Sequence, residues 1–116
     1  MGSFQDLVVW QKAMGLVREV YKLTEILPRE EKYGIVSQLR RSAVSVPSNI
    51  AEGHARTTKR DFSRFLSIAL GSLREVQTLL LLCDDLGLAK PSAQLTQCED
   101  IAKMLHGLMK SLEGKN

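Results

Sequence analysis

Residues 34–53 read GIVSQLRRSAVSVPSNIAEG, and this stretch decides how the chain folds. Apolar side chains recur in it at helical spacing on both sides of a proline. They are Val36, Leu39, Ala43, Val46 and Ile50. A proline inside a helix removes one backbone hydrogen bond and costs about 3 kcal/mol or more. Because the apolar spacing stays in phase across Pro47, we predict one long helix that is kinked there.

The alternative is a break between two separate helices at Pro47. The residue before a proline is pushed toward extended backbone geometry, so Val46 would then end the first of them. Ser42, Ser45 and Ser48 favour the kinked helix, because their hydroxyls can bond carbonyls freed near a proline and their small size admits a neighbouring helix. The sequence alone leaves both arrangements open.

The rest of the 116-residue chain continues the helical pattern, with few prolines and glycines to interrupt it. Four helices are expected, and they span residues 5–27, 30–55, 59–86 and 92–113. Short connections between long helices make sequential helices antiparallel. We therefore predict an all-α, up-down-up-down four-helix bundle that occupies residues 1–116 as a single domain.

The turn between the second and third predicted helices is expected at Gly53 and the following Thr57-Thr58 pair. Thr58, with Asp61 three residues later, resembles a capping box, in which two side chains satisfy the first free N–H groups of a helix. The third helix would therefore begin just after Thr58.

The first predicted helix carries two apolar stripes. One lies at Leu7, Trp10, Met14, Val17 and Tyr21, and the other at Val9, Ala13, Leu16, Val20, Leu23 and Leu27. The third predicted helix likewise carries one main apolar stripe and further apolar residues beside it. One four-helix core cannot bury all of these side chains, and surplus apolar surface is typical of a subunit interface. We therefore expect a homo-oligomer.

The composition is that of an ordinary soluble globular protein, with 44% apolar and 25% charged residues. No uninterrupted apolar run approaches the roughly 18 residues of a membrane span, and the N-terminus lacks the pattern of a signal peptide. Cys83 and Cys98 lie far apart on apolar seams, which does not indicate a disulfide-stapled secreted domain. These features predict a cytoplasmic protein with no membrane partner.

Motifs for catalysis or metal binding are missing from the sequence. Helical di-iron proteins use Glu-x-x-His, but Ala51 and Lys103 stand three residues before His54 and His106. The cysteines and histidines have no zinc-like spacing, and no glycine-rich phosphate loop is present. We therefore expect no enzymatic activity, no cofactor and no bound metal.

Positive charge gathers between residues 40 and 64, although the whole chain has a net charge of only +3. The candidate nucleic-acid-binding residues in this region are Arg40, Arg41, Arg56, Lys59, Arg60 and Arg64. Cations at the start of the third helix oppose its macrodipole, which indicates a role outside the helix, such as contact with phosphate. Local positive charge attracts polyanions, so RNA, DNA or a nucleic-acid-processing protein is the expected partner.

A structural interpretation of the same cations is also open. Solvated helix faces often carry such clusters, and Arg41 could pair with Glu52 or with a carboxylate of another subunit. Arg40 and Arg41, inside the helix body, fit this interpretation better than the residues from Arg56 to Arg64 do. Because only 5% of residues are aromatic, base-specific recognition by stacking is not expected.

Three stretches resemble one bacterial family. They are WQKAMGLVREVYKLTEILP at residues 10–28, YGIVSQLRRSAVSVPSNIAEG at 33–53 and FLSIALGSLREVQTLL at 65–80. These stretches look like the 23S rRNA intervening-sequence proteins, four-helix bundles of which some are encoded in insertions within 23S ribosomal RNA genes. The resemblance covers residues 4–90 closely and the last helix only in pattern. It implies an up-down bundle that assembles into a ring-like homopentamer.

The resemblance extends more distantly to the accessory proteins of diversity-generating retroelements, which are basic pentamers that associate with reverse transcriptase and nucleic acid. This chain lacks their strong overall basicity. The intervening-sequence family has no established biochemical activity that the resemblance could carry over to this chain. The resulting expectation is a non-enzymatic oligomeric scaffold that binds nucleic acid or a ribonucleoprotein through a repeated basic patch. The alternative is a homo-oligomeric protein-interaction module without nucleic-acid binding.

Overall fold

A computed structural model describes residues 2–113 and shows that helices make up the fold. The four α-helices are α1 (Val8–Glu25), α2 (Ile35–His54), α3 (Lys59–Asp85) and α4 (Ser92–Leu112). Two short 3-10 helices precede α1 and α2, namely η1 (Phe4–Asp6) and η2 (Arg29–Glu31). The described part of the chain contains no strand, so the all-α prediction is confirmed.

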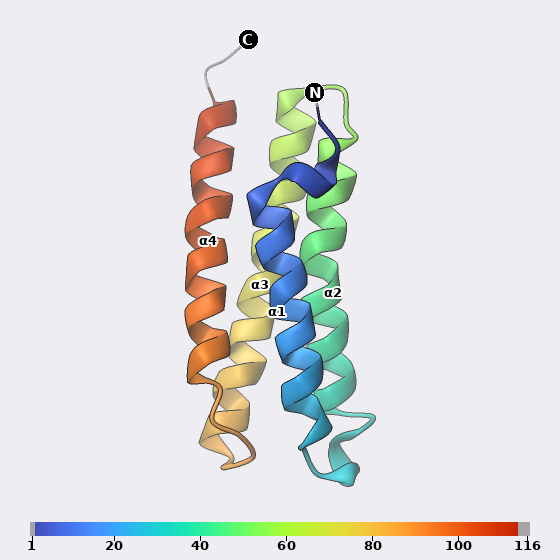
Figure 1. Cartoon of the computed structure of the whole chain (residues 1–116), viewed down its shortest axis with the longest axis vertical. Coiled ribbons are helices and arrows are strands. Elements are labelled where there is room, and N and C mark those ends of the chain that lie inside the picture. The colour runs from blue at the N-terminus through green and yellow to red at the C-terminus, as the bar shows by residue number, and fades with distance from the viewer. Residues whose placement is uncertain (1, 114–116) are drawn as a thin grey trace.

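The four helices run alternately up and down in a bundle of 49 × 19 × 19 Å (Figure 1). Each helix packs against the next one in the chain, and α1 closes the bundle by packing against α4. The pair formed by α2 and α3 has the most extensive contact. The α2–α3 turn and η1 lie at one end of the bundle, while η2 and the α3–α4 connection lie at the other. The predicted topology is confirmed.

All four helices contribute to one core. Its largest fully buried side chains include Leu16, Leu39, Ile50, Leu66, Leu73, Leu80, Ile101 and Leu105. Full burial of such a side chain contributes about 1.5–3 kcal/mol. Of the two stripes on α1, the one that contains Leu16 is buried in the core, whereas the one that contains Trp10 is only partly buried.

Helix α2 continues through Pro47 without a break, so the alternative in which Val46 ends a helix is wrong. A kink at this proline stays a prediction. We expected the serines near Pro47 to bond carbonyls of their own helix, but within residues 2–113 they form no such bonds. Instead, the hydroxyl oxygens of Ser45 and Ser72 lie 2.8 Å apart in a hydrogen bond between α2 and α3. The small side chain at position 45 thus admits the neighbouring helix closely, as predicted.

The segment before α2 differs from its prediction. We expected a helix from residue 30, but Glu30 and Glu31 belong to the separate η2, and α2 begins only at Ile35. Hydrogen bonds from the Glu31 N–H to the Pro28 carbonyl (2.9 Å) and from the Gly34 N–H to the Glu31 carbonyl (3.1 Å) hold this tighter connection. Local turn bonds therefore delay the start of α2.

Helix α3 is apolar and long enough to cross a membrane by length and composition alone. Its best 18-residue window has a mean hydropathy of 1.4, and 39% of that window is buried in the bundle. The sequence analysis missed this window because polar residues interrupt its apolar runs. The core helix of a soluble bundle has the same composition, and eight α3 side chains are buried here. The fold is therefore consistent with a soluble protein.

Candidate nucleic-acid interface

A glycine brings the end of α2 against the start of α3. Gly53 was expected in the turn, but it lies inside the last turn of α2 and is buried. A Cβ atom at this position would lie 2.7 Å from the Cβ of Phe65 and 3.2 Å from the carbonyl oxygen of Phe62. Only glycine permits this approach, so the turn that carries the basic residues is held close to α3.

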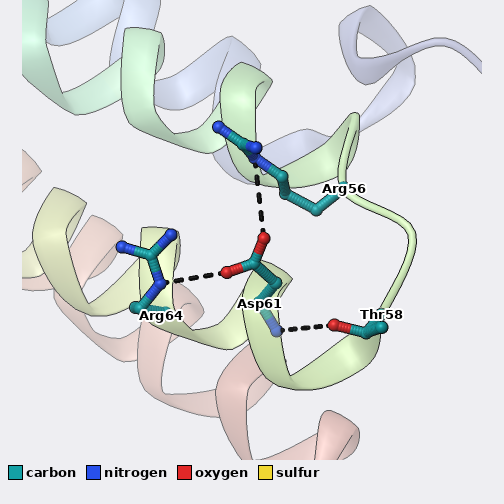
Figure 2. A network of polar contacts seen from close by, with 4 residues as sticks. All are labelled: Arg56, Thr58, Asp61 and Arg64. Atoms are coloured by element: carbon teal, nitrogen blue, oxygen red, sulfur yellow. Dashed lines mark hydrogen bonds and ion pairs between the residues drawn. The ribbon is translucent and has the colours of Figure 1, made fainter.

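The predicted cap of α3 is half formed. The hydroxyl oxygen of Thr58 accepts a hydrogen bond from the backbone N–H of Asp61 at 3.1 Å. No reciprocal hydrogen bond from the Thr58 N–H to the Asp61 carboxylate is found within the described residues. The carboxylate instead faces two arginines (Figure 2).

Asp61 lies between an arginine of the turn and an arginine of α3. Its Oδ1 atom is 3.0 Å from the Nε of Arg64, and its Oδ2 atom is 3.8 Å from the Nε of Arg56. Both guanidinium groups also lie over the ring of Phe65, at 4.5 Å for Arg56 and 4.7 Å for Arg64. We call these four residues the Asp61 cluster.

The Asp61 cluster orients its arginines more than it stabilises the fold. The side chains of Arg56 and Arg64 are 45% and 59% exposed. Exposed ion pairs contribute about 0–1 kcal/mol, and an exposed cation over an aromatic ring about 0.5–1 kcal/mol. The main result of these contacts is therefore two guanidinium groups held next to one another.

Lys59 and Arg60 complete the basic surface at this turn. Both are exposed, and neither forms an ion pair with a carboxylate among residues 2–113. From Arg56 to Arg64 there are four cations and the single carboxylate of Asp61, which leaves a net charge of +3. We call these four cations the turn patch.

The other two predicted residues lie elsewhere. Arg40 donates from Nε to the hydroxyl of Thr24 at 2.8 Å and stacks on Tyr21 at 4.3 Å, so it joins α2 to α1. Arg41 is exposed and lines a cleft between α2 and α3, about 20 Å from the end of α2. Within the described chain it does not pair with Glu52, which is about 16 Å away along the same helix.

The structure thus groups four of the six candidate residues and separates two. The sequence analysis missed the roles of Asp61 and Phe65. The spacing of Asp61 and Arg64, three residues apart on a helix, is a signal that could have indicated their ion pair. The contact with Arg56 had no such signal, because it depends on the shape of the turn.

The two cysteines of the chain lie in the core of the bundle. Cys83 and Cys98 are buried free thiols. Burial raises the pKa of Cys98 to about 12, and burial likewise raises the pKa of Cys83. Both thiols therefore stay protonated and act as small apolar groups in the core. Residues 2–113 contain no group of three or more His, Cys, Asp or Glu side chains that could hold a metal ion.

The fold defines a class of small proteins built as antiparallel four-helix bundles. The family described as 23S rRNA-intervening sequence protein matches residues 5–107. The chain belongs to this family, as the sequence resemblance predicted, and the match extends into α4. A search of curated proteins finds no match to the sequence.

A solved structure has the same fold. It is the crystal structure, at 1.70 Å resolution, of a protein with unknown function from the S23 ribosomal protein family of Bacteroides thetaiotaomicron VPI-5482. The two chains are 25% identical and superpose with a TM-score of 0.82. The similarity covers 89% of this chain and 99% of the other. The bundle described above is therefore a fold that the two proteins share.

Proposed function

We propose that this protein is a non-enzymatic, homo-oligomeric scaffold of the cytoplasm that binds the phosphate backbone of nucleic acid through the turn patch. The supporting observation is the placement of Lys59 and Arg60. Both lie exposed in the first turn of α3 and form no ion pair within residues 2–113. Cations at this position oppose the helix macrodipole, so they do not serve the helix itself.

Contact with phosphate, rather than with bases, fits the chemistry of the turn patch. The aromatic residue of the Asp61 cluster, Phe65, is buried and covered by two guanidinium groups, so it offers no face on which a base could stack. Binding would then depend little on sequence and strongly on salt, because it releases counterions from the nucleic acid.

Self-association is supported by two exposed apolar surfaces. One is a groove of about 310 Å³ between α1 and α2, lined by Trp10, Met14, Val17, Val44, Pro47, Ser48 and Ala51. The other, which we call the leucine end, consists of Leu81, Leu82 and Leu86 near the C-terminal end of α3; these side chains are 54%, 39% and 55% exposed.

Charged residues of opposite sign lie near the two apolar surfaces. Asp84 and Asp85 border the leucine end. Arg40 lies over Tyr21 one helical turn beyond the groove. Contact between the groove of one copy and the leucine end of the next would therefore pair unlike charges. An interface of two different patches closes into a ring where the rotation between copies permits it, and the family resemblance implies a ring of five subunits. A ring repeats the turn patch, so weak sites add by avidity.

The nucleic-acid proposal is tested by the affinity for single-stranded RNA and DNA, measured by fluorescence anisotropy between about 50 and 200 mM salt. We expect binding that weakens steeply as salt rises and is lost in the variant with Lys59→Glu and Arg60→Glu. The matched control has Arg29→Glu and Lys32→Glu, the same charge change at the opposite end of the bundle, and should bind like the wild type. Equal losses in both variants, or salt-independent binding, would contradict the proposal.

A second candidate function is a homo-oligomeric protein-interaction module without nucleic-acid binding. It is favoured by the two apolar surfaces and by Asp61, which neutralises part of the turn patch. Light scattering and the RNA titration together distinguish the two. An oligomer that binds neither RNA nor DNA at low salt would support this second function.

A further inference from the structure

The arginines of the Asp61 cluster use only one edge of their guanidinium groups. Asp61 contacts the Nε atom of Arg64 at 3.0 Å and that of Arg56 at 3.8 Å. No hydrogen bond from their terminal Nη groups is found within residues 2–113. Figure 2 shows both guanidinium ends directed away from the carboxylate. The Nη donors of both arginines are thus available to another ligand.

The two guanidinium groups are close enough to share one ligand. Their central carbons lie 4.5 and 4.7 Å from the centre of the Phe65 ring, so they are no more than about 9 Å apart. A charge-assisted hydrogen bond from arginine to a phosphate oxygen is about 2.7–2.9 Å long, and arginine donates two such bonds in parallel. A single phosphate group between the two arginines can therefore accept bonds from both.

We propose that Arg56 and Arg64 bind one phosphate group of a nucleic-acid backbone between them, and that Asp61 and Phe65 are positioning residues that fix the two guanidinium groups. This inference rests on the function proposed above and assigns different roles to the residues of the turn patch. Lys59 and Arg60 supply diffuse attraction, whereas the arginine pair supplies a site of defined shape.

Positioning matters because arginine has a long, flexible side chain. Free arginine side chains lose rotamer freedom when they bind, and this loss opposes association. The contacts with Asp61 and Phe65 already restrict both side chains in the free protein, so less freedom remains to be lost. The cluster keeps a net charge of +1, and both arginines are exposed enough for a phosphate to reach them.

Substitution of arginine by lysine tests the shape of this site separately from its charge. It carries the same charge as arginine, but it is a point charge without the planar fork that binds two phosphate oxygens. The variant with Arg56→Lys and Arg64→Lys therefore keeps every charge of the turn patch and loses only the shaped site. Its matched control has Arg29→Lys and Arg74→Lys, two exposed arginines outside the turn patch.

The affinity of each variant is measured with a fluorescein-labelled single-stranded RNA across the same salt range, with circular dichroism as a check of folding. We expect the affinity of the Arg56→Lys, Arg64→Lys variant to be about one-fifth of the wild-type affinity or lower, because bidentate bonds are replaced by point-charge contacts. Its salt slope should equal that of the wild type, since the number of cations is unchanged. The control should stay within about twofold of the wild type.

Each other outcome has a defined meaning. Wild-type affinity in the Arg56→Lys, Arg64→Lys variant, or an equal loss in the control, overturns the phosphate site while the proposed function stands. No RNA binding by the wild type at low salt overturns the proposed function itself. If the lysine variant does not fold, the Asp61→Ala variant provides the test. This substitution makes the net charge of the turn patch more positive, but it removes the carboxylate that positions the two arginines. Tighter RNA binding by this variant overturns the positioning role, and equal or weaker binding supports it.

Discussion

The two ends of α3 expose different kinds of side chain. At the N-terminal end, Thr58 caps the helix and the turn patch presents cations around one carboxylate. At the C-terminal end, exposed leucines stand beside Asp84 and Asp85, and the last turn contains no basic residue. Cations at the start of a helix and anions at its end both oppose the macrodipole.

This difference indicates that neither end is built for the stability of α3 alone. A helix optimised for itself would carry acidic residues first and basic residues last. The charges oppose the dipole at both ends, but apolar surface is exposed at only one end. We therefore infer that the two ends have separate functions. We propose phosphate contact for the N-terminal end and subunit contact for the C-terminal end, and the two proposals can be tested independently.

The largest expected effect comes from the leucine end. Replacing Leu81, Leu82 and Leu86 with serine should convert the oligomer into a monomer, because the change removes apolar surface from the proposed interface. Light scattering measures the particle mass. The variant with Lys59→Glu and Arg60→Glu is the control and should keep the wild-type mass. A wild-type protein that is already monomeric at micromolar concentration would refute the oligomer, and an oligomeric triple-serine variant would refute this interface.

A smaller effect is expected where the end of α2 meets the N-terminal end of α3. Gly53→Ala should lower the free energy of unfolding, because its Cβ would clash with the Cβ of Phe65 and the backbone of Phe62. Overpacking costs about 1–3 kcal/mol and outweighs the better helix propensity of alanine, worth up to about 1 kcal/mol. Urea unfolding measures the change.

The matched control for this substitution lies on the exposed face of α3. An added Cβ at Gly71 meets no atom within 4 Å. Gly71→Ala should therefore raise the free energy of unfolding by about 0.5–1 kcal/mol, through helix propensity alone. Changes of the same sign in Gly53→Ala and Gly71→Ala would contradict the close packing at the α2–α3 turn.

The smallest effect concerns the acidic residues at the C-terminal end of α3. Asp84→Asn and Asp85→Asn should each raise the free energy of unfolding by about 0.3–1 kcal/mol at low salt, because they remove anions from the negative end of the dipole. The measurement is made in the triple-serine background, where assembly does not contribute. Glu75→Gln, in the middle of α3, is the control and should change little. A gain that persists at high salt would contradict an electrostatic cause.

The sequence predicted the arrangement of helices well, because helical spacing survives in the pattern of apolar residues. The in-phase residues on both sides of Pro47 correctly predicted a continuous α2. The same pattern could not tell which stripe of α1 is buried, since the stripe of Leu16 and the stripe of Trp10 both consist mainly of apolar residues. It also placed Gly53 in a turn, because the reason for that glycine is Phe65, twelve residues away, and not the local backbone.

The candidate site was predicted less completely. Nearness in sequence correctly grouped Lys59, Arg60 and Arg64, which occupy the first turns of one helix. It could not show that Arg40 binds Thr24 on α1, because that contact depends on how α1 and α2 are rotated against each other. Charge counting also missed that Asp61 draws two arginines together, since the count contains no geometry.

The up-down order of four helices has a practical consequence for these experiments. An even number of helices returns the chain to the end from which it started, so η1 and the last turn of α4 lie at the same end as the α2–α3 turn (Figure 1). Any affinity tag or fused domain joined before η1 or after α4 emerges beside the turn patch. A charged tag there would compete for RNA or for the cations, so binding is best measured after tag removal.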